Sequence, residues 1–312
     1  HERYPKWSPD GKSIAYFSDE SGEYELHVRG QDGKGEARKF KLDGAGFYDD
    51  PVWSPDSEKI CFTDNSWSLY CIELKSGTIK KIASQYLLGP ERGRKFSHAF
   101  SPDSKWIVYT LNSKTYFQTV YAYSFEKDKS FAMTDGLSEV SEPTFDAGGK
   151  YLYFFGSTDA GPVKQWFDMS NADMRLTRSP YLVVLKKNIP SPLAKESDEE
   201  KGVQKEDKPK EEQGKDEKPK ESKPDAAEAF SIDFDGIQNR ILALQIPAGN
   251  YADLQPGTAG QFYFLKTMPA SSDPAAPGGE LHRYDLTKKK DDVILTGLAG
   301  YEISADKKKI LY

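Results

Sequence analysis

The sequence is poor in the residues that most often carry catalysis or bind metals. Its 312 residues include four histidines and two cysteines. It contains no Gly-x-Ser-x-Gly nucleophile elbow, no His-Glu-x-x-His helix, no Cys-x-x-Cys pair and no glycine-rich phosphate loop after a strand. We therefore expect no catalytic residue, no metal site and no bound cofactor in this chain.

Long apolar runs and basic patches are missing as well. No apolar stretch reaches the roughly 18 residues of a membrane-spanning helix, so a membrane is not an expected partner. No cluster of lysine and arginine is interleaved with aromatic residues, which argues against nucleic acid as a partner. The net charge of −6 says little, because much of it comes from one charged segment.

The two cysteines fall in neighbouring predicted strands of one hairpin. Cys61 and Cys71 would be able to face each other across the strand pair if the connecting loop has three residues. Because free cysteine often behaves as a small buried apolar residue, we expect two buried free thiols. Such thiols would not indicate a redox compartment.

What the sequence does contain is a repeated turn followed by a strand. Trp7-Ser8-Pro9-Asp10-Gly11 recurs at intervals of about 45 residues. Its further copies begin at Trp53, Phe100 and Phe145, and a last copy begins at Ile303 after a longer interval. Proline presets the backbone of a type I turn, aspartate bonds to nearby amides, and the apolar alternation that follows is typical of a strand. Repeats of this length predict an all-β fold, a β-propeller.

Four strands per repeat, or blade, are expected. In blade one they cover 3–8, 13–18, 24–29 and 36–41. Blade four is interrupted by an insertion at 157–178, for which a functional loop and mere decoration remain equally open. Later strands are expected at 230–234, 240–246, 261–266, 281–286 and 293–295.

A segment of very different composition interrupts the pattern. It is mostly charged and lacks aromatic residues, so it cannot bury enough apolar surface to fold. The predicted organisation is therefore blades one to four (part) over 1–190, a disordered charged tether over 191–228, and blades four (end) to six (truncated) over 229–312.

Two sets of side chains are candidates for special roles. The aromatic residues that open the repeats are expected to pack between blades rather than to bind a ligand. Charged residues recur where innermost strands begin, and in a propeller these positions surround the axis. They either cap the turn that enters the strand or form a mixed-charge rim that steers peptide termini. The rim candidates are Arg3, Asp49, Asp50, Arg94, Lys95, His98 and Glu142.

Segments inside and outside the repeats resemble one family. The stretch from His1 to Gly11 and the stretch from Asp50 to Ser57 resemble the second propeller of bacterial homologues of the tricorn protease. More specific are the parts that a generic propeller would not share. These are Gly156-Ser157-Thr158-Asp159-Ala160-Gly161, Thr177-Arg178-Ser179-Pro180-Tyr181-Leu182, the charged tether, and Pro247-Ala248-Gly249-Asn250-Tyr251.

The resemblance covers essentially the whole chain and implies a function. It implies a seven-bladed propeller, of which this chain holds five blades and the start of a sixth. Such a propeller is the non-catalytic part of a cytoplasmic serine peptidase, and it forms a channel and filter for peptides. The implied partners are peptide substrates, the remaining domains of the same polypeptide, which include the catalytic domain, and further copies in a homohexamer.

Two alternatives stay open. A Tol-type periplasmic propeller that binds a partner protein shares the Ser-Pro-Asp turns, but it would lack the insertion in blade four and the tether. The lid propeller of a prolyl-oligopeptidase-like enzyme would be followed by an α/β-hydrolase domain with a Gly-x-Ser-x-Gly elbow. A periplasmic or secreted location is the alternative to the cytoplasm.

Overall fold

The regular structure of the chain is almost entirely antiparallel strand. The computed structural model describes residues 1–42, 46–85, 96–115, 117–158, 176–194, 229–267 and 278–312. Most of the predicted insertion and nearly all of the predicted tether therefore lie outside the described residues. Within the described ranges the helix is one 3₁₀ turn, η3 (Ile237–Arg240), and none is long or apolar enough to cross a membrane.

Strands that follow each other in sequence pair into separate sheets, which we number in chain order. Sheet one contains β1 (Glu2–Trp7), β2 (Ser13–Ser18), β3 (Glu25–Gly30) and β4 (Arg38–Lys41). Sheet two contains β5 (Tyr48–Trp53), β6 (Lys59–Asp64), β7 (Ser68–Glu73) and β8 (Thr78–Ser84). Sheet three contains β9 (His98–Phe100), β10 (Trp106–Asn112), β11 (Gln118–Ser124) and β12 (Lys129–Ala132).

The later sheets follow the same plan. Sheet four contains β13 (Glu139–Phe145), β14 (Tyr151–Ser157), β15 (Ser179–Val184) and β16 (Ile241–Ala243). Sheet five contains β17 (Tyr251–Pro256), β18 (Gln261–Lys266), β19 (Gly279–Asp285) and β20 (Lys290–Leu298). Sheet six has two strands in the described part, β21 (Glu302–Ile303) and β22 (Ile310–Leu311).

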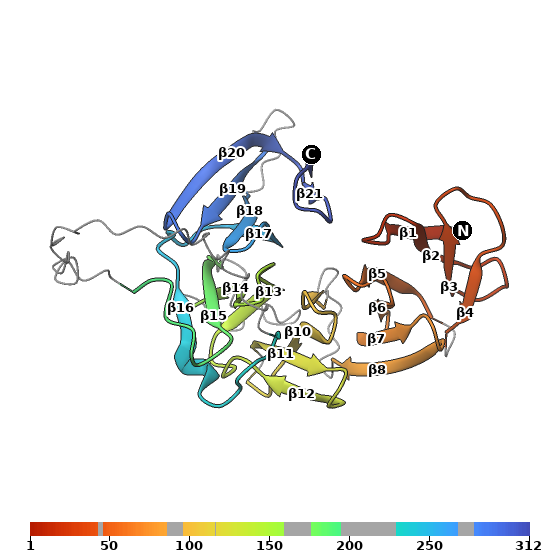
Figure 1. Ribbon diagram of the computed structural model, residues 1–312, viewed down its shortest axis with the longest axis horizontal. Coiled ribbons are helices and arrows are strands. Elements are labelled where there is room, and N and C mark those ends of the chain that lie inside the picture. The colour runs from red at the N-terminus through yellow and green to blue at the C-terminus, as the bar shows by residue number, and fades with distance from the viewer. Residues whose placement is uncertain (43–45, 86–95, 116, 159–175, 195–228, 268–277) are drawn as a thin grey trace, which may run out of the picture.

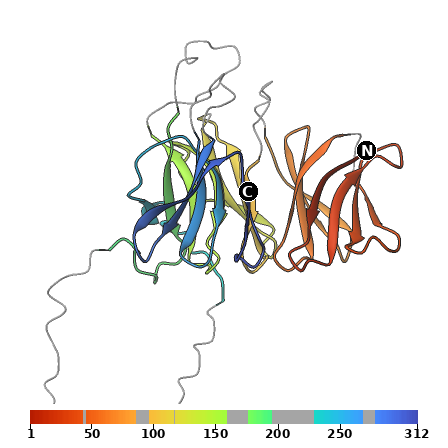
Figure 2. The same cartoon turned by 90° about the horizontal axis from the view of Figure 1, so that it is seen from above.

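The sheets are arranged around a common axis. Figure 1 shows them following one another along an arc, with first strands such as β5, β13 and β17 on the inside and last strands such as β8, β12 and β20 on the outside. Figure 2, turned by 90°, shows the same sheets standing side by side. Radially arranged four-stranded sheets are the architecture of a β-propeller. The predicted all-β propeller fold is confirmed.

The Ser-Pro-Asp turn owes its repetition to one hydrogen-bond pattern. The Ser8 hydroxyl donates to Asp10 Oδ1 at 2.6 Å and accepts from the Ser13 N–H at 2.9 Å. The turns that start at Ser54 and Ser101 are closed in the same way. The fourth turn residue has a positive φ of 70° at Gly11, a conformation that glycine adopts without strain.

Neighbouring turns are also bonded to each other. The N–H of Asp10 donates to the Ser57 hydroxyl of the next turn at 3.3 Å. The N–H of Asp56 donates in the same way to the Ser104 hydroxyl at 3.0 Å. The first two turns therefore each contact the next turn through its fourth residue, a serine.

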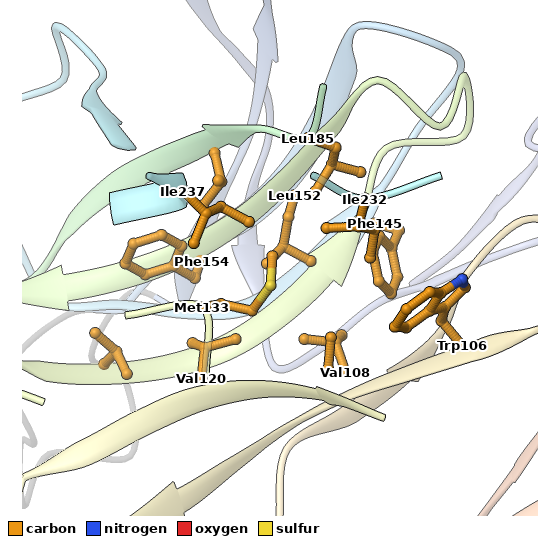
Figure 3. Packing of buried hydrophobic residues seen from close by; sticks show 13 residues of the cluster. Trp106, Val108, Val120, Met133, Phe145, Leu152, Phe154, Leu185, Ile232 and Ile237 are labelled. Carbon is orange, nitrogen blue, oxygen red and sulfur yellow. The ribbon is translucent and has the colours of Figure 1, made fainter. Parts of the chain in front are cut away.

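The hydrophobic core lies between the sheets and not within one central layer. Figure 3 shows the cluster between sheets three and four, where Val108 and Val120 of one sheet face Leu152 and Phe154 of the other, with Met133 among them. Similar clusters fill the spaces between sheets one and two, two and three, and four and five. Because both faces of an inner sheet are covered, its strands contain apolar residues on both sides.

The aromatic residues that open the repeats pack between sheets wherever a neighbouring sheet is present. Trp53 is 8% exposed, and its indole Nε1–H donates to the Lys6 carbonyl of sheet one at 3.1 Å. Phe100 and Phe145 are buried as well. The prediction is wrong for Trp7, which is 57% exposed, because no sheet in the described part of the chain covers that face of sheet one.

Two strand predictions after the tether need correction. Residues 230–234 are not a strand, because Phe230 and Phe234 are held by ring contacts with Phe145 and Phe131 rather than by strand pairing. The first strand of sheet five, β17, was not predicted. It lacks the Ser-Pro-Asp turn, and a register shift between Ala252 and Gln255 breaks its alternation.

The cysteines are paired and not free. Cys61 and Cys71 are register partners on β6 and β7, with Cα atoms 4.0 Å apart, and they form a disulfide. The loop between the strands, 65–67, has the short length that places the two residues opposite each other. The expectation of two free thiols is therefore wrong, because close cross-strand pairing brings both sulfur atoms together.

Candidate functional site at the axial strands

The first strands of four sheets share a bulge in the middle. In β5, Asp49 pairs with Thr63 and Val52 pairs with Cys61, so two residues of β5 stand opposite one of β6. Equivalent register shifts occur in β1, β13 and β17. In each of them one residue has a positive φ, and we call these the bulge residues: Tyr4 (53°), Asp50 (53°), Glu142 (53°) and Asp253 (61°).

A bulge re-aims side chains and leaves one backbone group out of the ladder. Because first strands lie on the inside of the arc, bulge residues stand next to the axis (Figure 1). Two of the bulge residues, Asp50 and Glu142, belong to the predicted rim. Two further rim candidates, Arg3 and Asp49, directly precede the bulge residues Tyr4 and Asp50. The rim candidates Arg94 and Lys95 lie outside the described residues.

Arg3 and Asp49 differ in how freely they face solvent. Arg3 is exposed, with its guanidinium 5.2 Å from the ring centre of Tyr4. Asp49 is half-buried and accepts a hydrogen bond from the Thr63 hydroxyl. Of these two, Arg3 therefore offers the charge that a passing ligand would meet.

His98 is enclosed between sheets two and three. Its side chain is 0% exposed, and Nδ1 lies 3.0 Å from the Phe96 carbonyl and 3.9 Å from Asp50 Oδ2. A carbonyl partner requires the proton on Nδ1, which leaves Nε2 as an acceptor, and within the described structure Nε2 has no hydrogen-bond partner. This environment fits packing between sheets better than contact with a peptide.

Glu142 is half-buried at the seam between sheets four and five. Its Oε2 accepts a hydrogen bond from the Leu254 N–H at 2.9 Å. Burial raises the pKa of Glu142, while the bond from Leu254 and the nearby Arg178 guanidinium act in the opposite direction. The Glu142 carboxylate of sheet four is therefore a hydrogen-bond acceptor for the backbone of sheet five.

Three charged residues next to the axis escaped the sequence prediction. Burial raises the pKa of Asp253, the bulge residue of sheet five. Lys6 Nζ of sheet one lies 3.5 Å from Glu302 Oε1 of sheet six, so these two sheets approach each other across the arc. Asp253 was missed because β17 was missed. Asp253 lies four residues before Gly257, the first residue of the next turn, as Asp50 lies four residues before Ser54. This spacing is the signal that would have found it.

His27 and His282 are buried away from these strands, and His1 is exposed. His27 packs edge-on against Tyr16. His282 contacts the carboxylate of Asp291 at 2.9 Å and stacks on Phe264 with ring centres 5.0 Å apart. In the described part of the structure no group of three His, Cys, Asp or Glu side chains is placed to hold a metal ion.

A comparison with protein families assigns the chain. The family model for the tricorn protease second beta propeller domain matches residues 1–312. The chain belongs to this family.

Relatives of this tricorn propeller are much longer proteins. The tricorn protease homolog of Saccharolobus solfataricus is 24% identical over 262 residues, which cover 83% of this chain and 21% of that protein. Tricorn protease homolog 1 of Streptomyces coelicolor is 25% identical over 268 residues, which cover 83% of this chain and 23% of that protein. The chain thus spans less than a quarter of the length of these relatives.

A solved structure gives the same assignment of fold. The crystal structure of the tricorn protease superposes with a TM-score of 0.70 and 18% identity, over 99% of this chain and 28% of that one. At this identity the likeness concerns the fold alone. The tricorn propeller described above therefore shares its architecture with that protease, and its own function has to be argued from its residues.

Proposed function

We propose that this chain is the non-catalytic propeller of a tricorn-like serine peptidase, in which the axial strands form a channel that guides and filters peptides. The catalytic domain lies elsewhere in the polypeptide. The family match over residues 1–312 carries the proposal. It is supported by the arrangement of the sheets, because the first strands, whose sequences carry these charged residues, lie on the inside of the arc (Figure 1).

The charges that would act on a peptide are those on side chains exposed to solvent at the axis. Arg3 is exposed, and Lys6 is engaged with Glu302 in a pair whose side chains are both solvent-accessible. Fixed charges that line an opening focus the electric field and raise the local concentration of oppositely charged ligands. We propose that Arg3 and Lys6 favour peptides with acidic residues or a free carboxyl terminus.

The assembly and the compartment belong to the same proposal. We infer association with the other domains of the polypeptide and a homohexameric assembly. The cytoplasmic location stays a prediction. The Cys61–Cys71 disulfide favours the periplasmic or secreted alternative, because disulfides persist mainly in oxidising compartments.

Reversing one exposed charge tests the channel. In the full-length enzyme, Arg3→Glu should lower kcat/KM for acidic peptides about three- to tenfold at low ionic strength, and salt should weaken the effect. Lys34→Glu is the matched control, because it makes the same charge change at an exposed turn between β3 and β4, away from the first strands. Equal effects of both variants, or no effect of Arg3→Glu, would contradict the proposal.

A further inference from the structure

The Glu142 carboxylate makes its hydrogen bond at a defined place in the next sheet. Its partner is the N–H of Leu254, the residue that directly follows the bulge residue Asp253. The register shift takes this N–H out of the pairing between β17 and β18. A buried N–H without an acceptor costs free energy, so Glu142 supplies what the bulge removes.

The next seam repeats the arrangement. Burial raises the pKa of the Asp253 carboxyl, while the Gln255 side chain, which donates to Oδ1 at 3.3 Å, and the nearby backbone amide of Tyr301 favour its charged form. Tyr301 belongs to sheet six and stands just before β21, three positions before the turn residue Ser304, as Leu254 stands three positions before Gly257. An acidic bulge residue again serves the strand of the following sheet.

The seam between sheets two and three brings the same positions together. Asp50 approaches His98, with Oδ2 3.9 Å from the imidazole Nδ1. His98 stands three positions before the turn residue Ser101, so it corresponds to Leu254 and Tyr301. This residue, too, has a backbone N–H.

The two remaining seams lack both the donor and the acid. The position that corresponds to Leu254 is Pro51 in sheet two and Pro143 in sheet four, and proline has no N–H. The positions that face them in the preceding sheets hold Tyr4 and Ser97, neither of which is acidic. An acid is therefore present where the next sheet has a donor and absent where it has proline.

We propose that Asp50, Glu142 and Asp253 act as latches between sheets. In each latch the carboxylate accepts a hydrogen bond from the backbone N–H of the residue that follows the bulge position in the next sheet. In this role the carboxylates are not offered to a passing peptide. The inference does not depend on the channel function. It assigns Asp50, Glu142 and Asp253 to contacts between sheets and leaves Arg3 and the Lys6–Glu302 pair as the accessible axial charges.

Hydrogen exchange at the Leu254 amide tests the latch directly. Glu142→Ala removes the acceptor and should speed exchange of this amide roughly tenfold or more, since hydrogen bonds to charged groups are worth about 1.5–3 kcal/mol. Glu142→Gln keeps a carbonyl oxygen at the same place, so its exchange should stay closer to that of the unmodified protein. An unchanged rate in Glu142→Ala, or equal acceleration in both variants, overturns the proposal.

A double-mutant cycle gives an independent measurement in the same full-length protein. Leu254→Pro removes the donor and copies the residue found in sheets two and four. In this background Glu142→Ala should no longer lower the melting temperature. Ser97→Asp is the matched control, because it adds an acid opposite Pro143 and should give no stabilisation. If Glu142→Ala lowers the melting temperature as much in the Leu254→Pro background as in the unmodified protein, the latch proposal is overturned. If Leu254→Pro does not fold, the hydrogen-exchange rates of the Leu254 amide decide. Neither readout uses peptidase activity, so failure of the latch and failure of the channel are distinguishable.

Discussion

Truncation of Trp53 measures how much one inter-sheet contact contributes to stability. Trp53 is 8% exposed, so nearly all of its side chain, about 230 Å², is buried against sheet one. At about 25 cal/mol per Å² this corresponds to a gross gain near 6 kcal/mol, which is an upper bound. Because the seam relaxes only in part, Trp53→Ala should lower the free energy of unfolding by about 3–5 kcal/mol.

The chain contains its own control for this prediction. Trp7 occupies the same place in the repeat but is 57% exposed, so it buries less than half as much of its surface. Trp7→Ala in the 312-residue chain should therefore cost only about 1–2 kcal/mol. Trp53→Phe keeps the ring but loses the hydrogen bond to the Lys6 carbonyl, and should cost about 1 kcal/mol beyond the smaller ring.

Chemical denaturation followed by circular dichroism measures all three variants under one condition. The slope of the unfolding transition should stay constant, so that midpoints can be compared. Equal losses for Trp53→Ala and Trp7→Ala would refute the reasoning. That result would mean that the seam between sheets one and two is open in solution, or that a further segment covers Trp7.

Two further predictions concern titration and the disulfide. The hydrogen bond that the His282 imidazole donates to the Asp291 carboxylate raises the pKa of His282. The stabilisation from this bond should therefore be full below about pH 6.5 and disappear as pH rises through the higher folded-state pKa. His282→Phe should lack this component of the pH profile of the unfolding free energy. Reduction of Cys61–Cys71 should lower stability by about 2–3 kcal/mol, as expected for a short closed loop. Titration of the unfolded, unreduced protein with a thiol reagent should find no free thiol, and two free thiols would contradict the pairing.

The sequence predicts the part of the fold that repeats and fails where the repeat is absent. The Ser-Pro-Asp turns locate most strands, because the same side-chain bonds close each turn. Strand β17 was missed since it has no such turn, and residues 230–234 were mistaken for a strand because phenylalanines pack equally well outside a sheet. The strand propensity of individual residues cannot distinguish a strand without the turn motif from an aromatic segment that packs outside a sheet.

The sequence indicates which strands carry the candidate residues but not which groups those residues contact. The charges at the start of the inner strands point to Asp50 and Glu142, and the fold places both beside the axis. Their partners come from other sheets, as the bond from Leu254 to Glu142 illustrates. A contact between residues so far apart in the chain leaves no trace in either local pattern. The proline that replaces the donor elsewhere is visible in the sequence, but its meaning appears only when neighbouring sheets are compared.

The hydrogen bond between successive turns has a consequence for how a repeat protein of this kind gains repeats in evolution. The Asp10 N–H donates a hydrogen bond to the Ser57 hydroxyl, and the Asp56 N–H donates one to the Ser104 hydroxyl, so the contact is head-to-tail. The turn at Ser54 carries both halves of this contact, because Asp56 donates to the next turn and Ser57 accepts from the preceding one. Duplication of a gene segment would therefore lengthen the array with a joint that already fits, before any new surface had evolved.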